Sequence, residues 1–263
     1  MFKRLQVIPV ALCLALLSMA HAAAAADKPK ARVAVIIDDV GNSRQDSSVL
    51  TINSPLTLAI LPHTPQAAKI ATAAGHANKE VIAHLPMQAH SGNKLGPGGL
   101  TLAMSQTEFQ ATVAEALASL PTAVGVNNHM GSLLTEQQQP MQWLMQELSA
   151  RKLYFVDSRT SLATVAEQTA LAAGIPTSRR HVFLDNSASE ENLNGQFDQL
   201  IRYALKHGEA IAIGHPHPAT ITMLKQRLPE LARLGIEVVP MSELLVQQKL
   251  LPQTISSSAA QDQ

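Results

Sequence analysis

The amino-acid sequence predicts an α/β fold, a distorted (β/α) barrel of seven to eight mostly parallel strands. Short apolar runs with β character alternate with amphipathic helical patterns, and this order favours a parallel sheet covered by helices. Six of the runs end directly in a carboxylate, an amide or an imidazole. Because the carboxyl ends of barrel strands meet on one face, these side chains are expected to share one site, which indicates an enzyme. An open doubly wound sheet, which binds ligands at the same strand ends, is the alternative.

The positions of the strands and helices follow from the periodicity of apolar residues. Strands are expected near residues 33–38, 56–61, 80–84, 123–128, 153–157, 181–185, 209–214 and 236–240. Helices are expected near residues 66–77, 105–120, 135–148, 161–173, 190–207 and 218–234. Ser105 and Glu108 form a capping box for the second helix, while Gly174 and Gly208 follow two later helices as C′ residues. The glycine-rich segment 88–100 is interpreted either as a substrate-contacting loop or as a flexible surface loop.

One folded domain, residues 27–250, is expected between two terminal segments. Residues 1–26 begin with basic residues, continue with a short apolar stretch and end with small residues, which is the pattern of a cleaved secretory signal. An uncleaved anchor is the alternative, although the apolar stretch is short for a membrane span. We therefore expect secretion across the inner membrane, a periplasmic location and no stable membrane span after cleavage. Residues 251–263 are polar and are expected to form a disordered tail.

The composition excludes several partners and kinds of chemistry. The formal net charge is zero and no dense basic run occurs, which argues against nucleic acid as a partner. The only cysteine, Cys13, lies in the expected signal, so the mature chain has no disulfide, thiol nucleophile or thiolate zinc site. Any metal ion must then be held by nitrogen and oxygen ligands. Aromatic residues make up 3% of the chain, so contact with carbohydrate would depend mainly on hydrogen bonds.

Asp38 and Asp39 form the sharpest pair of candidate residues. Two adjacent carboxylates at a strand end repel each other, so a metal ion, an arginine or backbone amides must hold them charged. Neighbouring side chains of a strand point in different directions, which allows one carboxylate to bind a metal ion while the other acts as a base. The alternative is structural, with the pair forming a turn or helix cap that leads into residues 41–43.

Imidazoles and one guanidinium stand at the ends of other expected strands. His84 is followed by Pro86, which prevents a regular helix and fixes the turn, and it is a candidate metal ligand, as is His129. Arg159 is suited either to orient Asp38 or to bind a carboxylate of a substrate. For each of these residues the alternative is a structural one, namely a buried hydrogen-bonded histidine or an ordinary ion pair.

His215 and His217 belong to a His-Pro-His-Pro sequence, in which the two prolines fix the backbone and pre-position both imidazoles. One can bind a metal ion while the other protonates a leaving group, since an imidazole suits acid catalysis near neutral pH. The alternative is that Pro218 only starts a helix. Asp185 is a weaker candidate and is interpreted as a cap of the helix that follows it.

Five segments taken together resemble a known family. They are Asp38–Gly41 (DDVG), His84–Gln88 (HLPMQ), Gly125–Ser132 (GVNNHMGS), Asp157–Ser161 (DSRTS) and Gly214–Pro218 (GHPHP). In this combination the chain resembles, from about Arg32 to Leu245, the divergent polysaccharide deacetylase family, a distant branch of the NodB-type carbohydrate esterases. The resemblance implies a distorted (β/α) barrel and a divalent metal ion, zinc by preference, held by one Asp and two His.

The resemblance also implies a set of metal ligands. Asp39 matches the aspartate ligand of the family, and His84 matches the first histidine of a His-x-x-x-His motif. Gln88 stands at the second histidine of that motif, which departs from the family pattern. The missing nitrogen is therefore expected from His129 or from one of His215 and His217, and His129 and His215 are assigned to the metal site beside Asp39 and His84.

The implied reaction is metal-assisted hydrolysis of an N-acetyl group. Asp38 is expected to be the base, His217 the general acid that protonates the departing amine, and Arg159 the substitute for an Arg-Pro-Pro-Tyr motif that the sequence lacks. The implied substrate is an N-acetylated polysaccharide of the cell envelope, of the peptidoglycan type. The competing hypothesis is a barrel that has lost catalysis and binds glycan or an envelope protein. The departure at Gln88 favours this alternative, whereas the intact pairs Asp38-Asp39 and His215-His217 favour the hydrolase.

Overall fold

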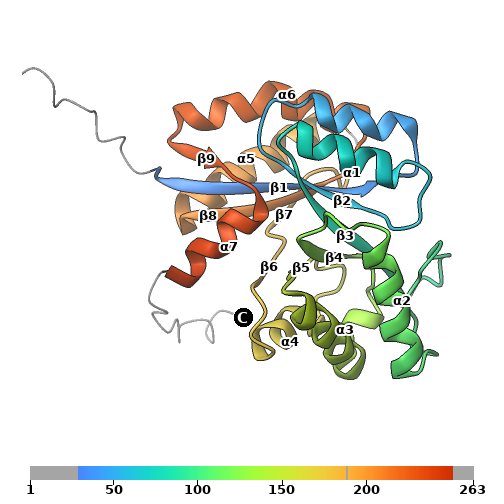
Figure 1. Ribbon diagram of the computed structural model, residues 1–263. Helices are drawn as coiled ribbons and strands as arrows, with labels where there is room; N and C mark the ends of the chain where they lie inside the picture. Colours follow the sequence, from blue (N-terminus) through green and yellow to red (C-terminus); the bar gives the residue numbers. More distant parts are fainter. Residues whose placement is uncertain (1–28, 188, 251–263) are drawn as a thin grey trace, which may run out of the picture.

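Nine strands form one curved sheet in the computed structural model, which describes residues 29–187 and 189–250 (Figure 1). The strands are β1 (Ala31–Val40), β2 (Thr57–Ile60), β3 (Glu80–Met87), β4 (Gly125–Met130), β5 (Tyr154–Asp157), β6 (Thr177–Arg179), β7 (Val182–Phe183), β8 (Glu209–Gly214) and β9 (Ile236–Val238). Their order is β6-β5-β4-β3-β2-β1-β8-β7, with β9 paired to β1, and every pairing is parallel. The predicted distorted barrel of parallel strands is thereby confirmed.

The sheet closes through the chain that joins its two outermost strands, β6 and β7. Only Arg180 and His181 separate these strands in the sequence. The amide of Arg180 donates to the carbonyl of Asp157 in β5, and the amide of His181 donates to the carbonyl of Ile211 in β8. This segment therefore changes partners from one edge of the sheet to the other. The sequence predicted one strand here, near 181–185, and missed β6, because its three residues, Thr-Ser-Arg, carry no apolar pattern.

Six helices on the outside of the sheet correspond to the predicted ones (Figure 1). They are α1 (Ala67–His76), α2 (Gln106–Ala118), α3 (Gln138–Arg151), α4 (Ala166–Ala172), α5 (Glu190–His207) and α6 (Pro218–Arg233), and two unpredicted 3-10 turns are η2 (Arg44–Thr51) and η3 (Leu134–Glu136). Ser105 caps α2 in a capping box, and Gly208 ends α5 in a left-handed conformation, both as predicted. The cap of α5 is Ser189, so the interpretation of Asp185 as that cap is wrong.

Two hydrophobic cores lie on the two faces of the sheet. The larger core fills the space between the sheet and the helices, and it includes Val33, Val35 and Ile37 of β1. The smaller core fills the inside of the barrel, and it includes Ala34 and Ile36 of the same strand. This division follows from the alternation of side chains along a strand. Because both faces are buried, the strands appear in the sequence as continuous apolar runs.

Helix α7 (Met241–Leu250), which the sequence did not predict, closes the end of the barrel where the strands begin (Figure 1). Its residues Met241 and Leu244 belong to the interior core. The amide of Met241 donates to Thr57 Oγ1 at 3.0 Å, and the following amide donates to Glu80 Oε1 at 3.2 Å. Both acceptors are the first residues of their strands, so the opposite end of the barrel is the one that presents the functional groups.

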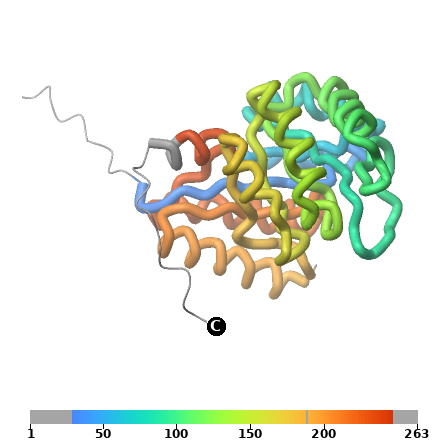
Figure 2. Tube along the Cα trace, turned by 90° about the horizontal axis from the view of Figure 1, so that it is seen from below, coloured from blue at the N-terminus to red at the C-terminus, as the bar shows by residue number. Residues whose placement is uncertain are grey.

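The connection between β3 and α2 is a long loop that stands out from the body of the molecule (Figure 2). Gly92, Gly96 and Gly98 in this loop have positive φ angles, which explains the choice of glycine there. The two expected terminal segments, 1–26 and 251–263, lie outside the described residues. Among the residues that are described, no helix combines the length and apolar character needed to cross a bilayer.

We predict that Gly125→Ala destabilises the barrel. A Cβ at Gly125 would lie 2.4 Å from the ring of Tyr154, whose hydroxyl donates to Glu80 Oε1 at 2.6 Å and is therefore fixed. Overpacking of this kind costs about 1–3 kcal/mol in free energy of unfolding, which urea denaturation would measure. The control is Gly195→Ala in α5, where nothing lies within 4 Å of the added Cβ. In this control the free energy of unfolding should rise by roughly 0.5–1 kcal/mol. Equal effects of the two substitutions would contradict the close packing of Gly125 against the Tyr154 ring.

Candidate active site

The strand ends surround one cavity of about 370 Å³. Of the side chains to which the sequence assigned a catalytic or metal-binding role, the structure brings six to its wall: Asp38, Asp39, His84, His129, Arg159 and His215. His217 is not among the lining residues; it is the exposed N-cap residue of α6. The wall also contains Arg180 and Phe183, to which the sequence assigned no catalytic or binding role. The topology therefore gathers residues from widely separated parts of the chain into one polar site.

A β-bulge positions the two carboxylates. Between its last two pairings with β2, strand β1 contains two residues, Asp38 and Asp39, where β2 contains one. Asp39 adopts a φ of 59°, a left-handed conformation that aspartate tolerates better than most residues. In a regular strand the two side chains would point to opposite faces, whereas a bulge re-aims one of them. As a result, His84 Nε2 lies 3.7 Å from Asp38 Oδ2 and 3.2 Å from Asp39 Oδ1.

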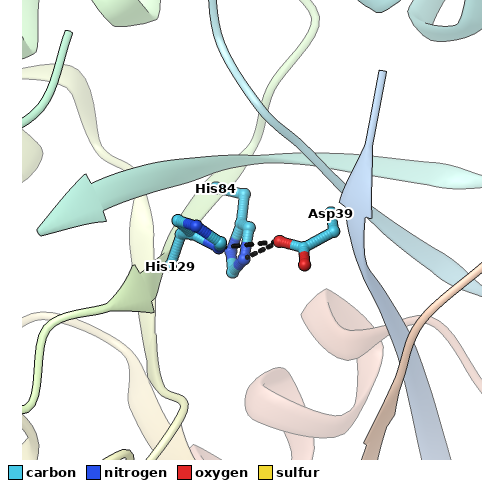
Figure 3. A group of neighbouring side chains, drawn as sticks. All are labelled: Asp39, His84 and His129. Carbon is cyan, nitrogen blue, oxygen red and sulfur yellow. Dashed lines mark ion pairs between the residues drawn. The ribbon is translucent and has the colours of Figure 1, made fainter. Parts of the chain in front are cut away.

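Asp39 lies against two imidazoles, as Figure 3 shows. Its Oδ1 atom is 3.2 Å from His84 Nε2 and 2.7 Å from His129 Nδ1, yet it is buried and makes no hydrogen bond of normal geometry. The three donor atoms lie within 4.8 Å of one another. Burial raises the pKa of Asp39, but the two imidazoles outweigh burial and hold this pKa below its ordinary value. One carboxylate oxygen and two imidazole nitrogens that converge in this way fit a divalent metal ion such as zinc.

Asn127, in β4, links the carboxylates to the imidazoles. Its Nδ2 donates to Asp38 Oδ1 at 2.7 Å, and its Oδ1 lies 2.6 Å from His84 Nδ1. Because an ionised carboxylate only accepts hydrogen bonds, the amide nitrogen must face Asp38, and the amide oxygen then accepts from Nδ1–H of His84. This leaves His84 Nε2, the atom nearest Asp39, free to bind a metal ion. No local pattern in the sequence indicates this long-range bridge, because the two partners of Asn127 lie on other strands.

Burial and neighbouring charges shift the pKa values of Asp38 and His84 in opposite directions. Burial raises the pKa of Asp38, and its contacts with His84 and Asn127 reduce this effect without cancelling it. A carboxylate with a raised pKa is a stronger base near neutral pH. Burial lowers the pKa of His84, but the charges of Asp38 and Asp39 outweigh burial, and the net shift of that pKa is upward.

His215 forms a separate pair with Asp185. Its Nδ1 lies 2.9 Å from Asp185 Oδ1, and Asp185 Oδ2 accepts from the amide of His215 at 2.7 Å and from Thr220 Oγ1 at 2.8 Å. Burial lowers the pKa of His215, but the bond to Asp185 outweighs burial and raises it. Since Nδ1 is engaged, Nε2 is the ring nitrogen left for further contacts, and it lies 3.7 Å from Asp39 Oδ2. The ring of His217 is 5.7 Å from that of His215.

The turn after β5 brings Arg159 to the cavity. Arg159 has a φ of 50°, and its amide donates to Asp157 Oδ1 at 2.8 Å. Asp157 Oδ2 accepts from Thr164 Oγ1 at 2.8 Å, so Asp157 holds the turn together. This turn also explains why α4 begins at Ala166 and not near residue 161. In the described part of the chain, neither Arg159 nor Arg180 forms an ion pair with Asp38.

Gln88 supports the long loop instead of lining the cavity. Its side-chain oxygen accepts from the amide of Leu102 at 2.8 Å, and its own amide donates to the carbonyl of Leu100 at 2.9 Å. The second imidazole beside Asp39 comes from the neighbouring strand, where His129 is in register with Pro86. The structure thus supplies from β4 a nitrogen that the sequence lacks at position 88.

Comparison with known proteins places the chain in a family. Residues 35–245 match the model of divergent polysaccharide deacetylases. The chain belongs to the divergent polysaccharide deacetylase family. One relative is the uncharacterized protein YibQ of Escherichia coli, 38% identical over 232 residues that cover 88% of this chain and 72% of YibQ. Another is an uncharacterized protein of Haemophilus influenzae, 38% identical over 224 residues that cover 85% of this chain and 80% of the relative.

Solved structures share the fold of this deacetylase-family chain at lower identity. The uncharacterized protein ATU2773 of Agrobacterium tumefaciens superposes with a TM-score of 0.77 at 23% identity, over 81% of this chain and 89% of that one. The catalytic domain of a peptidoglycan N-acetylglucosamine deacetylase from Eubacterium rectale superposes with a TM-score of 0.52 at 14% identity, over 80% of this chain and 88% of that one. At these identities the likeness concerns the fold alone.

We predict that Asp185→Asn lowers the pKa of His215. The substitution removes the anion that stabilises the imidazolium and leaves burial, which disfavours it. An NMR titration of the His215 ring in the metal-free protein would measure the change. Asp198→Asn, which removes a carboxylate that pairs with Arg227 on the outside of α5, is the control and should leave the ring unaffected. An unchanged His215 pKa in Asp185→Asn would show that the pair does not set its protonation.

Proposed function

We propose that this protein is an exported, metal-dependent hydrolase that removes N-acetyl groups from a polysaccharide of the cell envelope. The observation that carries the proposal is the convergence of Asp39, His84 and His129 beside a second carboxylate, that of the buried Asp38, in a chain of the polysaccharide deacetylase family. The family supports the reaction class, and the three donor atoms support a resident divalent ion.

Asp39, His84 and His129 are the residues that would hold this ion, which we propose to be zinc. When bound, the ion would polarise the acetyl carbonyl and lower the pKa of water at the site. Asn127 contributes by keeping the proton of His84 on Nδ1, so that Nε2 presents its lone pair to the site. Oxygen and nitrogen ligands of this kind are the set expected for an exported chain without a thiolate.

Asp38 and His215 are suited to move the protons of an amide hydrolysis. Asp38 is buried and its pKa is raised by that burial, so it is the proposed base that accepts a proton from the attacking water. Among the imidazoles, we assign the proton donor to the departing amine to His215 and not to His217, because His215 lines the cavity and is held by Asp185. This pairing keeps Nδ1 engaged and directs Nε2 to the reactants.

We extend the proposal to the location of the protein and to its substrate. The basic, apolar and small-residue pattern of residues 1–26 supports export and a periplasmic location. An N-acetylated glycan of the peptidoglycan type is the proposed substrate, since the family is one of polysaccharide deacetylases and a structural neighbour of similar fold is named as a peptidoglycan N-acetylglucosamine deacetylase. The long loop of residues 88–104 starts at the end of β3, the strand that carries His84, and is suited to contact a polymer.

A barrel without catalysis that binds glycan is the second candidate, and the observation in its favour is Gln88. Its side chain is committed to the amide of Leu102, so it does not serve as a ligand. The observation against it is His129, which meets Asp39 at 2.7 Å and restores a second imidazole. A binding module also has no need of Asp38, a second carboxylate buried beside the first.

We predict near-stoichiometric zinc or a similar ion in the purified mature protein, measured by mass spectrometry of the metal content. The ion should be lost in Asp39→Ala and in His84→Ala, because each removes a proposed ligand. His90→Ala is the control, since His90 is an exposed imidazole whose ring meets Glu136 outside the cavity. Asp38→Asn should keep the metal and lower the rate of acetate release from acetylated glycans by roughly 10²–10⁴-fold, the usual contribution of a general base.

The opposite results would favour the binding module. If the protein contains no metal and takes up none on titration, the assignment of Asp39, His84 and His129 as metal ligands is contradicted. If the protein holds metal but the wild type and Asp38→Asn are equally active, the role of Asp38 as the base is contradicted.

A further inference from the structure

Two guanidinium groups line the cavity besides the carboxylates and imidazoles. Arg159 follows β5, and Arg180 lies in the two-residue crossing between β6 and β7. Burial lowers the pKa of Arg180, and the charge of Arg159 lowers it further, which shows that the two cations are within electrostatic reach of each other. Two cations brought together in a partly buried site repel each other, so their proximity calls for an explanation.

Arg180 is held rigidly by backbone groups and an aromatic ring. Its Nε donates to the carbonyl of Ser158 at 2.7 Å, and its Nη2 donates to the carbonyl of Arg159 at 2.9 Å. The guanidinium carbon lies 4.8 Å from the centre of the Phe183 ring. These contacts use one edge of the guanidinium, and within the described residues its Nη1 has no hydrogen-bond partner. The group is therefore fixed in place with donors still unused.

Within the described part of the chain, the pair has no carboxylate bound directly to it, although the charges of Asp38 and Asp157 act on Arg180 electrostatically. Among the described residues, the Arg159 guanidinium makes no hydrogen bond or ion pair, and Arg180 makes no ion pair. The charge of Arg159 acts to lower the pKa of Glu167, but Glu167 forms its ion pair with the exposed Arg179, at 3.2 Å. Asp38 and Asp39 are engaged with Asn127 and the imidazoles. Two guanidinium groups without an ion-pair partner among the described residues thus line the space that a substrate would enter.

We infer that Arg159 and Arg180 form an anion subsite that binds a carboxylate or phosphate group carried by the acylated sugar itself. Guanidinium groups match the geometry of both anions through paired N–H donors. The inference rests on the proposed function, and it narrows the substrate class from N-acetylated glycans in general to those whose N-acetyl sugar bears an acidic group. A cavity of about 370 Å³ is in the range of pockets that bind small molecules, which suits one such sugar unit.

A purely structural role is the competing explanation for Arg180. Its bonds to Ser158 and Arg159 tie the turn after β5 to the crossing segment, and removing them would loosen that turn. Arg159 separates the two explanations, because among the described residues its guanidinium makes no hydrogen bond or ion pair that would stabilise the fold. Arg159→Gln should therefore keep the thermal stability of the protein while it weakens the binding of an anionic sugar.

The test compares three sugars that share the N-acetyl group: N-acetylglucosamine, its 6-phosphate and its 3-O-lactyl ether, which carries a carboxylate. Binding is measured by calorimetry on the purified protein in the Asp38→Asn background, which slows turnover. We expect at least one anionic sugar to bind about tenfold more tightly than the neutral one, which is the size of a charge-assisted hydrogen bond. The preferred anion then identifies whether the subsite takes phosphate or carboxylate.

Substitutions of the two arginines test whether they form the anion subsite. The preference for the anionic sugar should disappear in Arg159→Gln and Arg180→Gln and persist in the control Arg179→Gln, which removes the same charge one residue away from the site. Equal binding of the three sugars, undetectable binding of all of them, or a preference that survives both cavity substitutions would overturn the inference. Because the readout is binding, a protein that prefers an acidic sugar without hydrolysing it would contradict the proposed function and still support the subsite.

Discussion

The bulge in β1 is the constraint on which the geometry of the site depends. Where two residues oppose one, the backbone of Asp39 turns into the left-handed region and both carboxylates approach His84. In a regular strand one carboxylate would face the apolar layer beneath the helices, where burying it without a partner is costly. The bulge places both in one polar cavity, and the resulting negative charge is offset by His84, His129 and the amide of Asn127.

Two polar networks then fix the imidazoles that face the cavity. In one, Asn127 engages His84 Nδ1, and in the other, Asp185 engages His215 Nδ1. Both arrangements leave Nε2 as the unengaged ring nitrogen, and in each ring this atom lies near a carboxylate oxygen of Asp39. The first network is anchored on strands, since His84 belongs to β3 and Asn127 to β4. The second joins the segments that directly follow β7 and β8. Such preorganisation is what a hydrolase and a metal site both require.

Closure of the barrel and the electrostatics of the cavity are consequences of the same short segment. The chain from β6 to β7 leaves β5 and joins β8, and the crossing residue Arg180 is thereby brought to the cavity wall. Its bonds to the carbonyls of Ser158 and Arg159 connect the crossing to the turn after β5. In this member of the deacetylase family, one of the two guanidinium groups of the cavity therefore comes from the crossing between the short strands β6 and β7.

By itself, the sequence determined the alternation of strands and helices and placed Asp38, His84 and His129 at strand ends, because apolar periodicity reports which local residues are buried. The tertiary structure decided which of these side chains meet. His129 reaches Asp39 because β4 pairs with β3 in one particular register. The imidazole of His215 is held by a carboxylate from the connection after β7. Strand β6, helix α7 and the role of Arg180 have no local signal, because each is stabilised by contacts with residues distant in the sequence, and such pairings leave no periodic pattern in the chain.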